Sequence, residues 1–210
     1  MTNVEFKEMS FQEKYEKVQE TLDMYWSFKT GFVQKHLGGE VANEFVQLVQ
    51  QTQDPIPDGA SAEARYDVIY GNWARMGELS VTFIRDRLGE KGLEEFLSDE
   101  VEVLKERNAS FSLTLLAFLR AISRGRAFKT VADQLAYELQ WLTPYEVIEL
   151  DQKRLLIDMP ACKVLDYPGA DNRCHVCRTV YPRWVAEQFK VNMVFDRQGR
   201  SCTLSATPLG

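Results

Sequence analysis

The chain has 210 residues, of which 45% are hydrophobic and 27% are charged, and its net charge is −6. These proportions are ordinary for a globular protein with a sizeable core, arranged as one large domain or two modest ones. An acidic chain lacks the basic face that general nucleic-acid binders use, so we expect no nucleic-acid partner.

Hydrophobic runs along the sequence are shorter than the roughly 18 residues that a membrane helix needs. The first residues, MTNVEFKEMSFQEKYEK, are charged and lack the apolar stretch of a secretory signal. We therefore expect a cytoplasmic protein with no membrane partner and with reduced cysteines.

Residues 1–143 show the apolar spacing of helices, which predicts a helical region. The prolines and glycine of 54–61 predict a loop within it. The segment SFSLTLLAFLRAI (110–122) is apolar on nearly every side, so it predicts a central buried helix.

Two stretches of the helical region resemble each other. FVQKHLGGEVANEF (32–45) aligns without gaps on FIRDRLGEKGLEEF (83–96), and Phe, Leu, Gly, Glu and Phe coincide. One interpretation is a duplicated helix-glycine-helix unit that faces a shared pocket. The other is that such corners look alike because glycine suits the end of a helix.

From residue 144 onward, short runs rich in β-branched and aliphatic residues predict strands, with Asp151-Gln152 as a hairpin turn. A loop is expected at 166–172, and a helix with proline in its first turn at 179–189. The expected strands are 146–150, 153–159, 191–196 and 201–206.

The predicted fold class is α+β. A helical N-terminal region (1–143) packs on a small C-terminal mixed or antiparallel sheet (144–210), and we expect the two regions to form one compact unit.

All four cysteines lie in the C-terminal region, at Cys162, Cys174, Cys177 and Cys202. A Cys-x2-Cys pair on a short turn can bring both sulfurs onto one metal, and neighbouring strands could add the other two. Four thiolates predict a closed, usually structural zinc site, and an iron–sulfur cluster with the same ligand count is less favoured. The alternative is that some cysteines are small buried hydrophobic residues.

Other side chains could supply catalysis or ligand binding near the cysteines. His175 could be a ligand, a proton shuttle or a bystander, and Asp166 and Asp171 are further acid or base candidates. Arginine can hold a carboxylate through two hydrogen bonds and tryptophan can line an apolar cavity, although a solvated surface and plain core are their commoner roles. The candidate ligand-binding residues are Arg173, Arg178, Trp73 and Trp184.

The stretch from RCHVC (173–177) through a helix and a strand to Gly199-Arg-Ser-Cys202 resembles the V4R-like group. This group includes the 4-vinyl-reductase-type domains and the L-2-amino-thiazoline-4-carboxylic acid hydrolase-like proteins, and in its phenol-sensing members cysteines and an acidic residue hold zinc. The resemblance implies that Cys162, Cys174 or Cys177, and Cys202 are the ligands. The chain departs from the group in its true Cys-x2-Cys and in Thr203-Leu204-Ser205 after the last cysteine.

The resemblance implies a hydrolase that opens or hydrolyses a small cyclic or amide-like carboxylate, in a pocket between the helices and the cysteine-bearing sheet. A metal with an open position would activate water there, whereas a closed site would brace the pocket wall and leave acid–base work to His175, Asp166 or Asp171. The competing hypothesis is a non-catalytic ligand-binding or sensor module, or an accessory protein that forms a homodimer through its helices.

Overall fold

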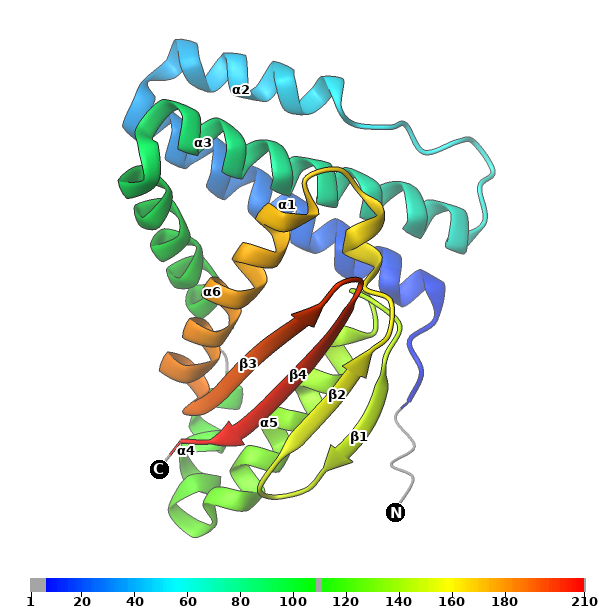
Figure 1. Ribbon diagram of the computed structural model, residues 1–210, viewed down its shortest axis with the longest axis vertical. Coiled ribbons are helices and arrows are strands. Elements are labelled where there is room, and N and C mark those ends of the chain that lie inside the picture. Colours follow the sequence, from blue (N-terminus) through cyan, green and yellow to red (C-terminus); the bar gives the residue numbers. More distant parts are fainter. Residues whose placement is uncertain (1–6, 109–110, 210) are drawn as a thin grey trace. The chain divides into compact units, whose positions relative to one another are not determined.

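The computed structural model describes residues 7–108 and 111–209, with the backbone alone at 111–115. It shows an α+β fold with a helical N-terminal region and a small C-terminal antiparallel sheet of four strands (Figure 1), which confirms the predicted fold class. Within the described ranges, no helix combines the length and the apolar character that crossing a membrane requires. The elements are α1 (Phe11–Leu37), α2 (Gly39–Gln51), α3 (Ala62–Arg107), α4 (Phe111–Ile122), α5 (Arg124–Leu139), β1 (Glu146–Leu150), β2 (Leu155–Met159), the 3-10 helix η1 (Lys163–Asp166), α6 (Ala170–Phe189), β3 (Val191–Gln198) and β4 (Ser201–Pro208).

The chain forms two compact units. We name them the helical unit, built from Met9–Glu100 and Asp166–Cys174, and the sheet unit, built mainly from Val101–Leu165 and His175 onward. The expected boundary near residue 143 is not where these units part, because α4 and α5 belong with the sheet. The short segment 166–174 joins the helical unit.

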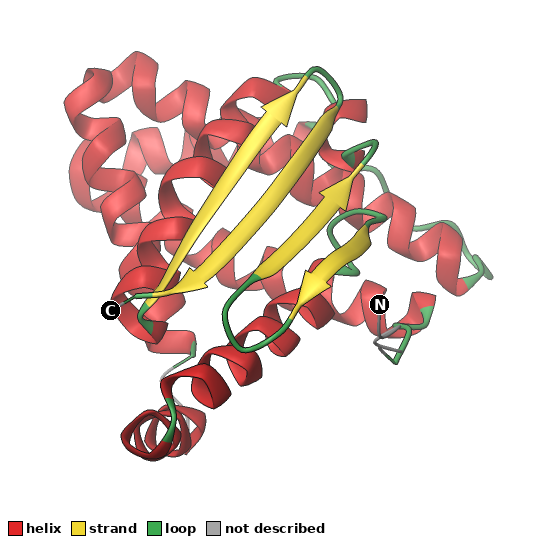
Figure 2. Cartoon of the chain, turned by 60° about the horizontal axis from the view of Figure 1, so that its bottom comes forward, coloured by secondary structure: helices red, strands yellow, loops and turns green. Residues whose placement is uncertain are grey.

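The sheet unit has the strand order β1-β2-β4-β3, with every neighbouring pair antiparallel. Alternate residues of β2, such as Leu155 and Ile157, are buried against α5 and α6, whose core residues include Ala132 and Val185. Figure 2 shows the strands side by side in one twisted sheet. One buried face and one exposed face explain the period-two pattern that predicted these strands.

The hairpin between β1 and β2 forms where the sequence predicts it. The Asp151 carboxylate accepts hydrogen bonds from the backbone N–H groups of Lys153 (2.6 Å) and Arg154 (2.9 Å). These two bonds stabilise the ionised carboxylate and so lower the pKa of Asp151. The turn is therefore fixed by a side chain that mimics a backbone acceptor.

Helix α4 differs from the buried central helix that we predicted. Leu116 is buried, but Phe118 is 63% exposed and Ile122 is 61% exposed. Within the sheet unit, α5 packs along one side of α4. The other apolar side chains of α4 are therefore not buried by α5. The prediction is wrong for 117–122, and the side chains of 111–115 lie outside the described residues.

The helical unit contains two corners at the matched glycines of the repeated stretches. Gly38, between α1 and α2, has φ 87° and ψ 170°, and Gly89, within α3, has φ 69° and ψ −172°. This combination of angles is open almost only to glycine. The two repeats therefore bend the chain in the same way at the same position.

The two repeats also contact each other reciprocally. The first phenylalanine of each packs on the last phenylalanine of the other, with ring centroids 5.1 Å apart for Phe32–Phe96 and 5.2 Å for Phe45–Phe83. The polar contacts follow the same rule, since His36 Nε2 lies 3.8 Å from Glu95 and Arg87 Nη2 lies 2.6 Å from Glu44. Such exchange of equivalent contacts is what a two-fold arrangement produces.

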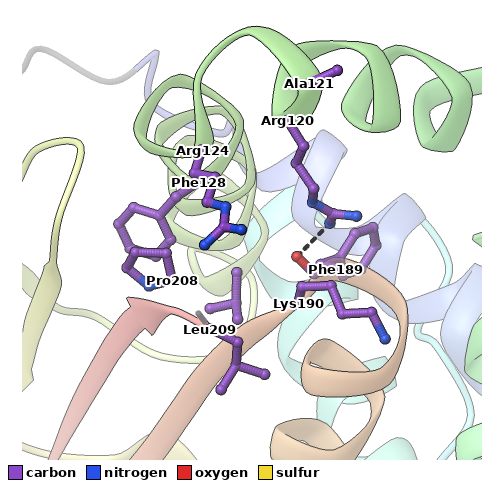
Figure 3. A pocket seen from close by; sticks show the side chains of 9 residues that line it. Arg120, Ala121, Arg124, Phe128, Phe189, Lys190, Pro208 and Leu209 are labelled. Carbon is purple, nitrogen blue, oxygen red and sulfur yellow. Dashed lines mark hydrogen bonds between the residues drawn. The ribbon is translucent and has the colours of Figure 1, made fainter.

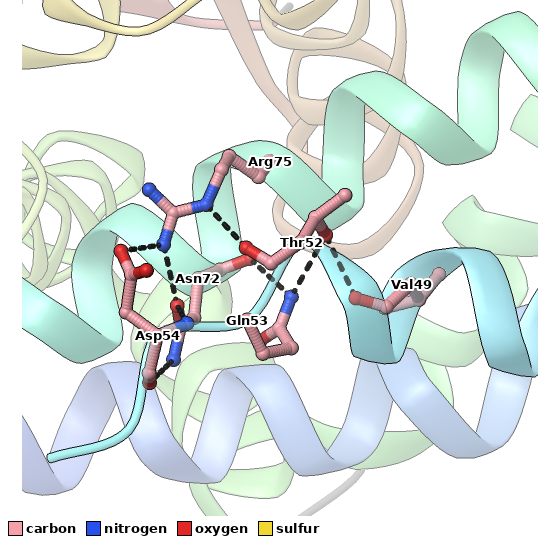
Figure 4. A network of polar contacts seen from close by, with 6 residues as sticks. All are labelled: Val49, Thr52, Gln53, Asp54, Asn72 and Arg75. Atoms are coloured by element: carbon pink, nitrogen blue, oxygen red, sulfur yellow. Dashed lines mark hydrogen bonds and ion pairs between the residues drawn. The ribbon is translucent and has the colours of Figure 1, made fainter.

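The loop after α2 is fastened to α3 by a polar network (Figure 4). The backbone N–H of Asp54 donates to Asn72 Oδ1 at 2.8 Å, and Asn72 Nδ2 donates back to the Asp54 carbonyl at 2.9 Å. Arg75 donates from Nε to the Thr52 carbonyl and from Nη2 to the Asp54 carboxylate, both at 2.6 Å. The backbone of this loop is therefore hydrogen bonded to side chains on one face of α3.

Candidate functional site

Three charged side chains lie buried inside the helical unit. Lys29 of α1, Glu100 of α3 and Arg173 of α6 are each at most 2% exposed. Charged groups are rarely buried to this extent unless they are paired or serve a site. We name these three residues the buried charge cluster.

Lys29 is the most perturbed member of the cluster. Its ammonium nitrogen lies 5.2 Å from the centroid of the Tyr25 ring and 5.8 Å from that of Phe96, so aromatic faces supply part of the solvation that water would give. Burial lowers the pKa of Lys29 to about 8, Glu100 partly opposes this and Arg173 adds to it. The charge of Lys29 is therefore coupled to those of Glu100 and Arg173.

Arg173 enters the cluster from the first turns of α6. The N-terminal end of α6 is held on α3, because Asn172 Nδ2 donates to Glu78 at 2.9 Å and Arg85 Nη1 donates to Asn172 Oδ1 at 3.0 Å. The guanidinium carbon then lies 4.0 Å from the centroid of the Trp73 ring. Gly77 makes room for it, since a Cβ atom at that position would lie 2.3 Å from Arg173 Nη1.

Glu100 is the member of the cluster whose carboxylate lacks hydrogen bonds to the described residues. Both carboxylate oxygens are buried and have no hydrogen-bond partner among the described residues. A buried acceptor without a donor costs about 1–3 kcal/mol, and more when the group is charged. An arrangement of this kind is typical of a position that a ligand or an ordered water completes.

The structure brings together two of the four ligand-binding residues that the sequence suggested. Arg173 and Trp73 are in contact, although they are far apart along the chain. The other two lie on the part of α6 that belongs to the sheet unit, where Arg178 is exposed and Trp184 packs edge-on against Phe189, with ring centroids 5.4 Å apart. The cluster therefore contains one predicted arginine and one predicted tryptophan.

The predicted acid and base candidates lie elsewhere. Asp166 ends η1 and Asp171 lies in the first turn of α6, and both are exposed, so neither belongs to the buried charge cluster. His175 is half-buried on α6, in the part that belongs to the sheet unit.

The four cysteines are each half-buried. Cys174 and Cys177 lie one turn apart on α6, because this helix begins at Ala170 instead of the predicted 179, so the short chelating turn that we predicted is wrong. Cys202 lies opposite Met159 in the sheet, and the backbone N–H of Cys162 donates to the Arg200 carbonyl at 3.0 Å. The described part of the chain contains no group of three His, Cys, Asp or Glu side chains placed to hold a metal.

Sequence reasoning missed Lys29 and Glu100, yet a signal for both is present. Lys29 occupies the apolar stripe of α1, four residues after Tyr25 and three before Phe32. Glu100 likewise falls four residues after Phe96 on the buried side of α3. A charge at a core position of an amphipathic helix marks a side chain that must be solvated by the protein or by a ligand. No family model and no curated protein matches this sequence.

Proposed function

We propose that the protein binds a small carboxylate-bearing molecule at the buried charge cluster and hydrolyses a cyclic or amide-like bond in it. The observation that carries the proposal is the Glu100 carboxylate. It is buried, neither of its oxygens is hydrogen bonded to a described residue, and its charge acts on the buried Lys29. The resemblance to thiazoline-carboxylate hydrolases supports the same class of ligand.

The charges of the cluster define the ligand chemistry. The two formal positive charges of Lys29 and Arg173 exceed the single negative charge of Glu100 by one, so an anionic ligand would neutralise the cluster. Arg173 suits a carboxylate, because its planar guanidinium offers parallel N–H donors and its central carbon lies over the Trp73 ring. Glu100 suits a donor, either an N–H group of the ligand or a water molecule.

The same geometry gives each side chain a role in hydrolysis. Glu100 would accept the proton of a water whose oxygen forms a bond to the electrophilic carbon of the ligand. The carbon–nitrogen bond then breaks and the proton passes to the leaving nitrogen, so atoms and charge balance. Lys29 stabilises the negative charge that develops on the electrophilic centre, while Arg173 holds the carboxylate in place.

The test is a calorimetric binding screen of small cyclic carboxylates, run beside a product assay. Arg173→Lys keeps the charge but loses the planar fork, so we expect at least a tenfold weaker binding constant, or about 1.4 kcal/mol. Arg178→Lys, an exposed change on the same helix, is the matched control. Equal binding by both variants, or no binding by the wild type across the panel, would contradict the proposal.

Non-catalytic binding is the second candidate. It is favoured by the depth of the cluster, because a carboxylate with so little exposed surface is shielded from bulk water. The variant Glu100→Gln separates the two functions, since it keeps the shape and removes the base. Turnover lost with binding retained indicates a hydrolase, whereas a wild type that binds a ligand and never converts it indicates a binding or sensor protein.

Zinc binding by the cysteines stays a prediction from the sequence, and the reaction proposed above uses no metal. Metal analysis of protein purified without oxygen tests it, with an absorption spectrum to detect an iron–sulfur cluster. One zinc per chain in the wild type, lost in Cys202→Ser, would support a cysteine site. A zinc-to-protein ratio near zero in the wild type would contradict it.

A further inference from the structure

A second site is indicated in the sheet unit, away from any residue that the proposed function uses. A cavity of about 330 Å³ opens where the end of α4 and the start of α5 meet the ends of β3 and β4. This volume is within the range of small-molecule pockets. Its lining includes Arg120, Arg124 and Lys190, and none of its described lining residues is acidic.

The rest of the lining is apolar. Phe128, Phe189, Val191 and Leu209 contribute side chains to the walls. Figure 3 shows Arg120 and Arg124 extending from the α4–α5 side toward the strand ends. The cavity therefore combines an apolar interior with several positive charges, the pattern that suits an amphipathic anion.

The fold holds the Arg120 side chain and the backbone of Lys190 in place. Arg120 donates a hydrogen bond from Nη2 to the Phe189 carbonyl, and its other N–H groups belong to the same rigid fork. Lys190 is the only residue other than glycine with positive φ in the described ranges, at 53°. Its backbone is fixed on both sides, because its N–H donates to Ala186 and its carbonyl accepts from Leu209.

A left-handed lysine is uncommon, and strain of this kind collects at functional positions. Glycine or asparagine would adopt this backbone with less strain, so the turn alone does not explain a lysine. We propose that this cavity binds a small monoanionic carboxylate with an alkyl or aromatic body, its head group contacting Arg124 and Lys190 and its body lying against Phe128, Phe189 and Leu209.

The test uses octanoate below its critical micelle concentration, with octanol as the neutral analogue of the same length. We expect saturable octanoate binding by isothermal titration calorimetry, at least tenfold tighter than octanol because of the charge-assisted contacts. Arg124→Gln and Lys190→Asn should each weaken octanoate binding about fivefold to tenfold. Asparagine tolerates positive φ, so the second change removes the charge while keeping the turn.

Arg126→Gln is the matched control, because Arg126 is an exposed residue of the same helix and does not line the cavity. It should leave octanoate affinity unchanged. Equal affinity for octanoate and octanol, or equal weakening by Arg126→Gln and Arg124→Gln, would overturn the proposal. Binding to vesicles of phosphatidylcholine with phosphatidylserine, without saturable octanoate binding, would also overturn it and indicate a membrane surface as the partner. Because these residues belong to the sheet unit alone, either result leaves the proposal for the buried charge cluster intact.

Discussion

The central carbon of the Arg173 guanidinium lies 4.0 Å from the centroid of the Trp73 ring, and this contact joins the start of α6 to the first half of α3. It depends on the missing side chain of Gly77, where a Cβ atom would lie within 2.8 Å of three Arg173 atoms. The position of the cation is therefore set by a glycine that touches no ligand.

The variant Gly77→Ala should displace Arg173 and cost about 1–3 kcal/mol of unfolding free energy, because the added methyl overfills a packed site. Denaturant unfolding followed by tryptophan fluorescence measures both the stability and the environment of Trp73. Gly31→Ala is the control, since Gly31 is also helical and a Cβ there meets nothing within 4 Å. It should stabilise the protein by about 0.5–1 kcal/mol, and similar effects of the two changes would contradict this account.

The lowered pKa of Lys29 predicts a pH-dependent stability. Its pKa is about 8 in the folded protein and 10.5 ordinarily, so between these values the unfolded chain holds more protons. The unfolding free energy contributed by this group therefore rises with pH across that window, by roughly 2 kcal/mol between pH 8 and pH 10. The checking measurement is the difference in unfolding free energy between wild type and Lys29→Met at the two pH values.

Lys35→Met is the control for that experiment, because it removes a lysine of the same helix whose side chain is 66% exposed. Its difference from wild type should stay constant from pH 8 to pH 10. If Lys29→Met also shows a constant difference, Lys29 does not lose its proton in this range.

Because Gly38 and Gly89 form equivalent corners, substituting either glycine should lower the stability by a similar amount. Gly38→Ala and Gly89→Ala should each destabilise the protein by about 1–3 kcal/mol, because both backbones occupy a region that alanine avoids. Nothing lies within 4 Å of a Cβ at either position, so steric crowding does not add to this cost. Thermal unfolding of both variants tests the expectation, and a neutral effect at one corner only would show that the two are not equivalent.

The polar network between α3 and the loop after α2 predicts a local loss of stability when Asn72 is replaced. Asn72→Ala removes the acceptor for the Asp54 N–H and the donor for its carbonyl, which should cost about 1–3 kcal/mol. Amide hydrogen exchange of the loop should accelerate together with the loss of stability. The control is Gln12→Ala, which removes only an exposed helix-surface pair and should change the unfolding free energy by about 0.5 kcal/mol at most.

The sheet could be predicted from the sequence because its local signals agree. Period-two alternation, the Asp151 turn and the start of the last strand near residue 201 all indicate the same hairpins. The start of α6 was missed because 166–172 contains proline and glycine, and the short η1 helix and the Asn172 contacts let the helix begin before Cys174. The burial of α4 was overestimated because an all-apolar circumference does not say how many neighbours a helix has.

The candidate site was only partly predictable. Arg173 and Trp73 could be named as residue types suited to a ligand, but their contact depends on tertiary packing across Gly77. The cysteines carried most weight in the sequence because short spacings are visible there. Lys29 and Glu100 carry more weight in the structure, because burial is what makes a single charge unusual.

The reciprocal packing of the two repeats also limits where a charge can be placed. Extending the alignment of 32–45 on 83–96 beyond its ends matches Lys29 with Ser80 and Glu100 with Val49, and all four residues are buried. The lysine and the acid therefore occupy one of two equivalent settings, and the other is neutral. Two identical chains could not differ in this way, whereas repeats joined in one polypeptide can, so the covalent link allows a symmetric core to hold a single, asymmetric site.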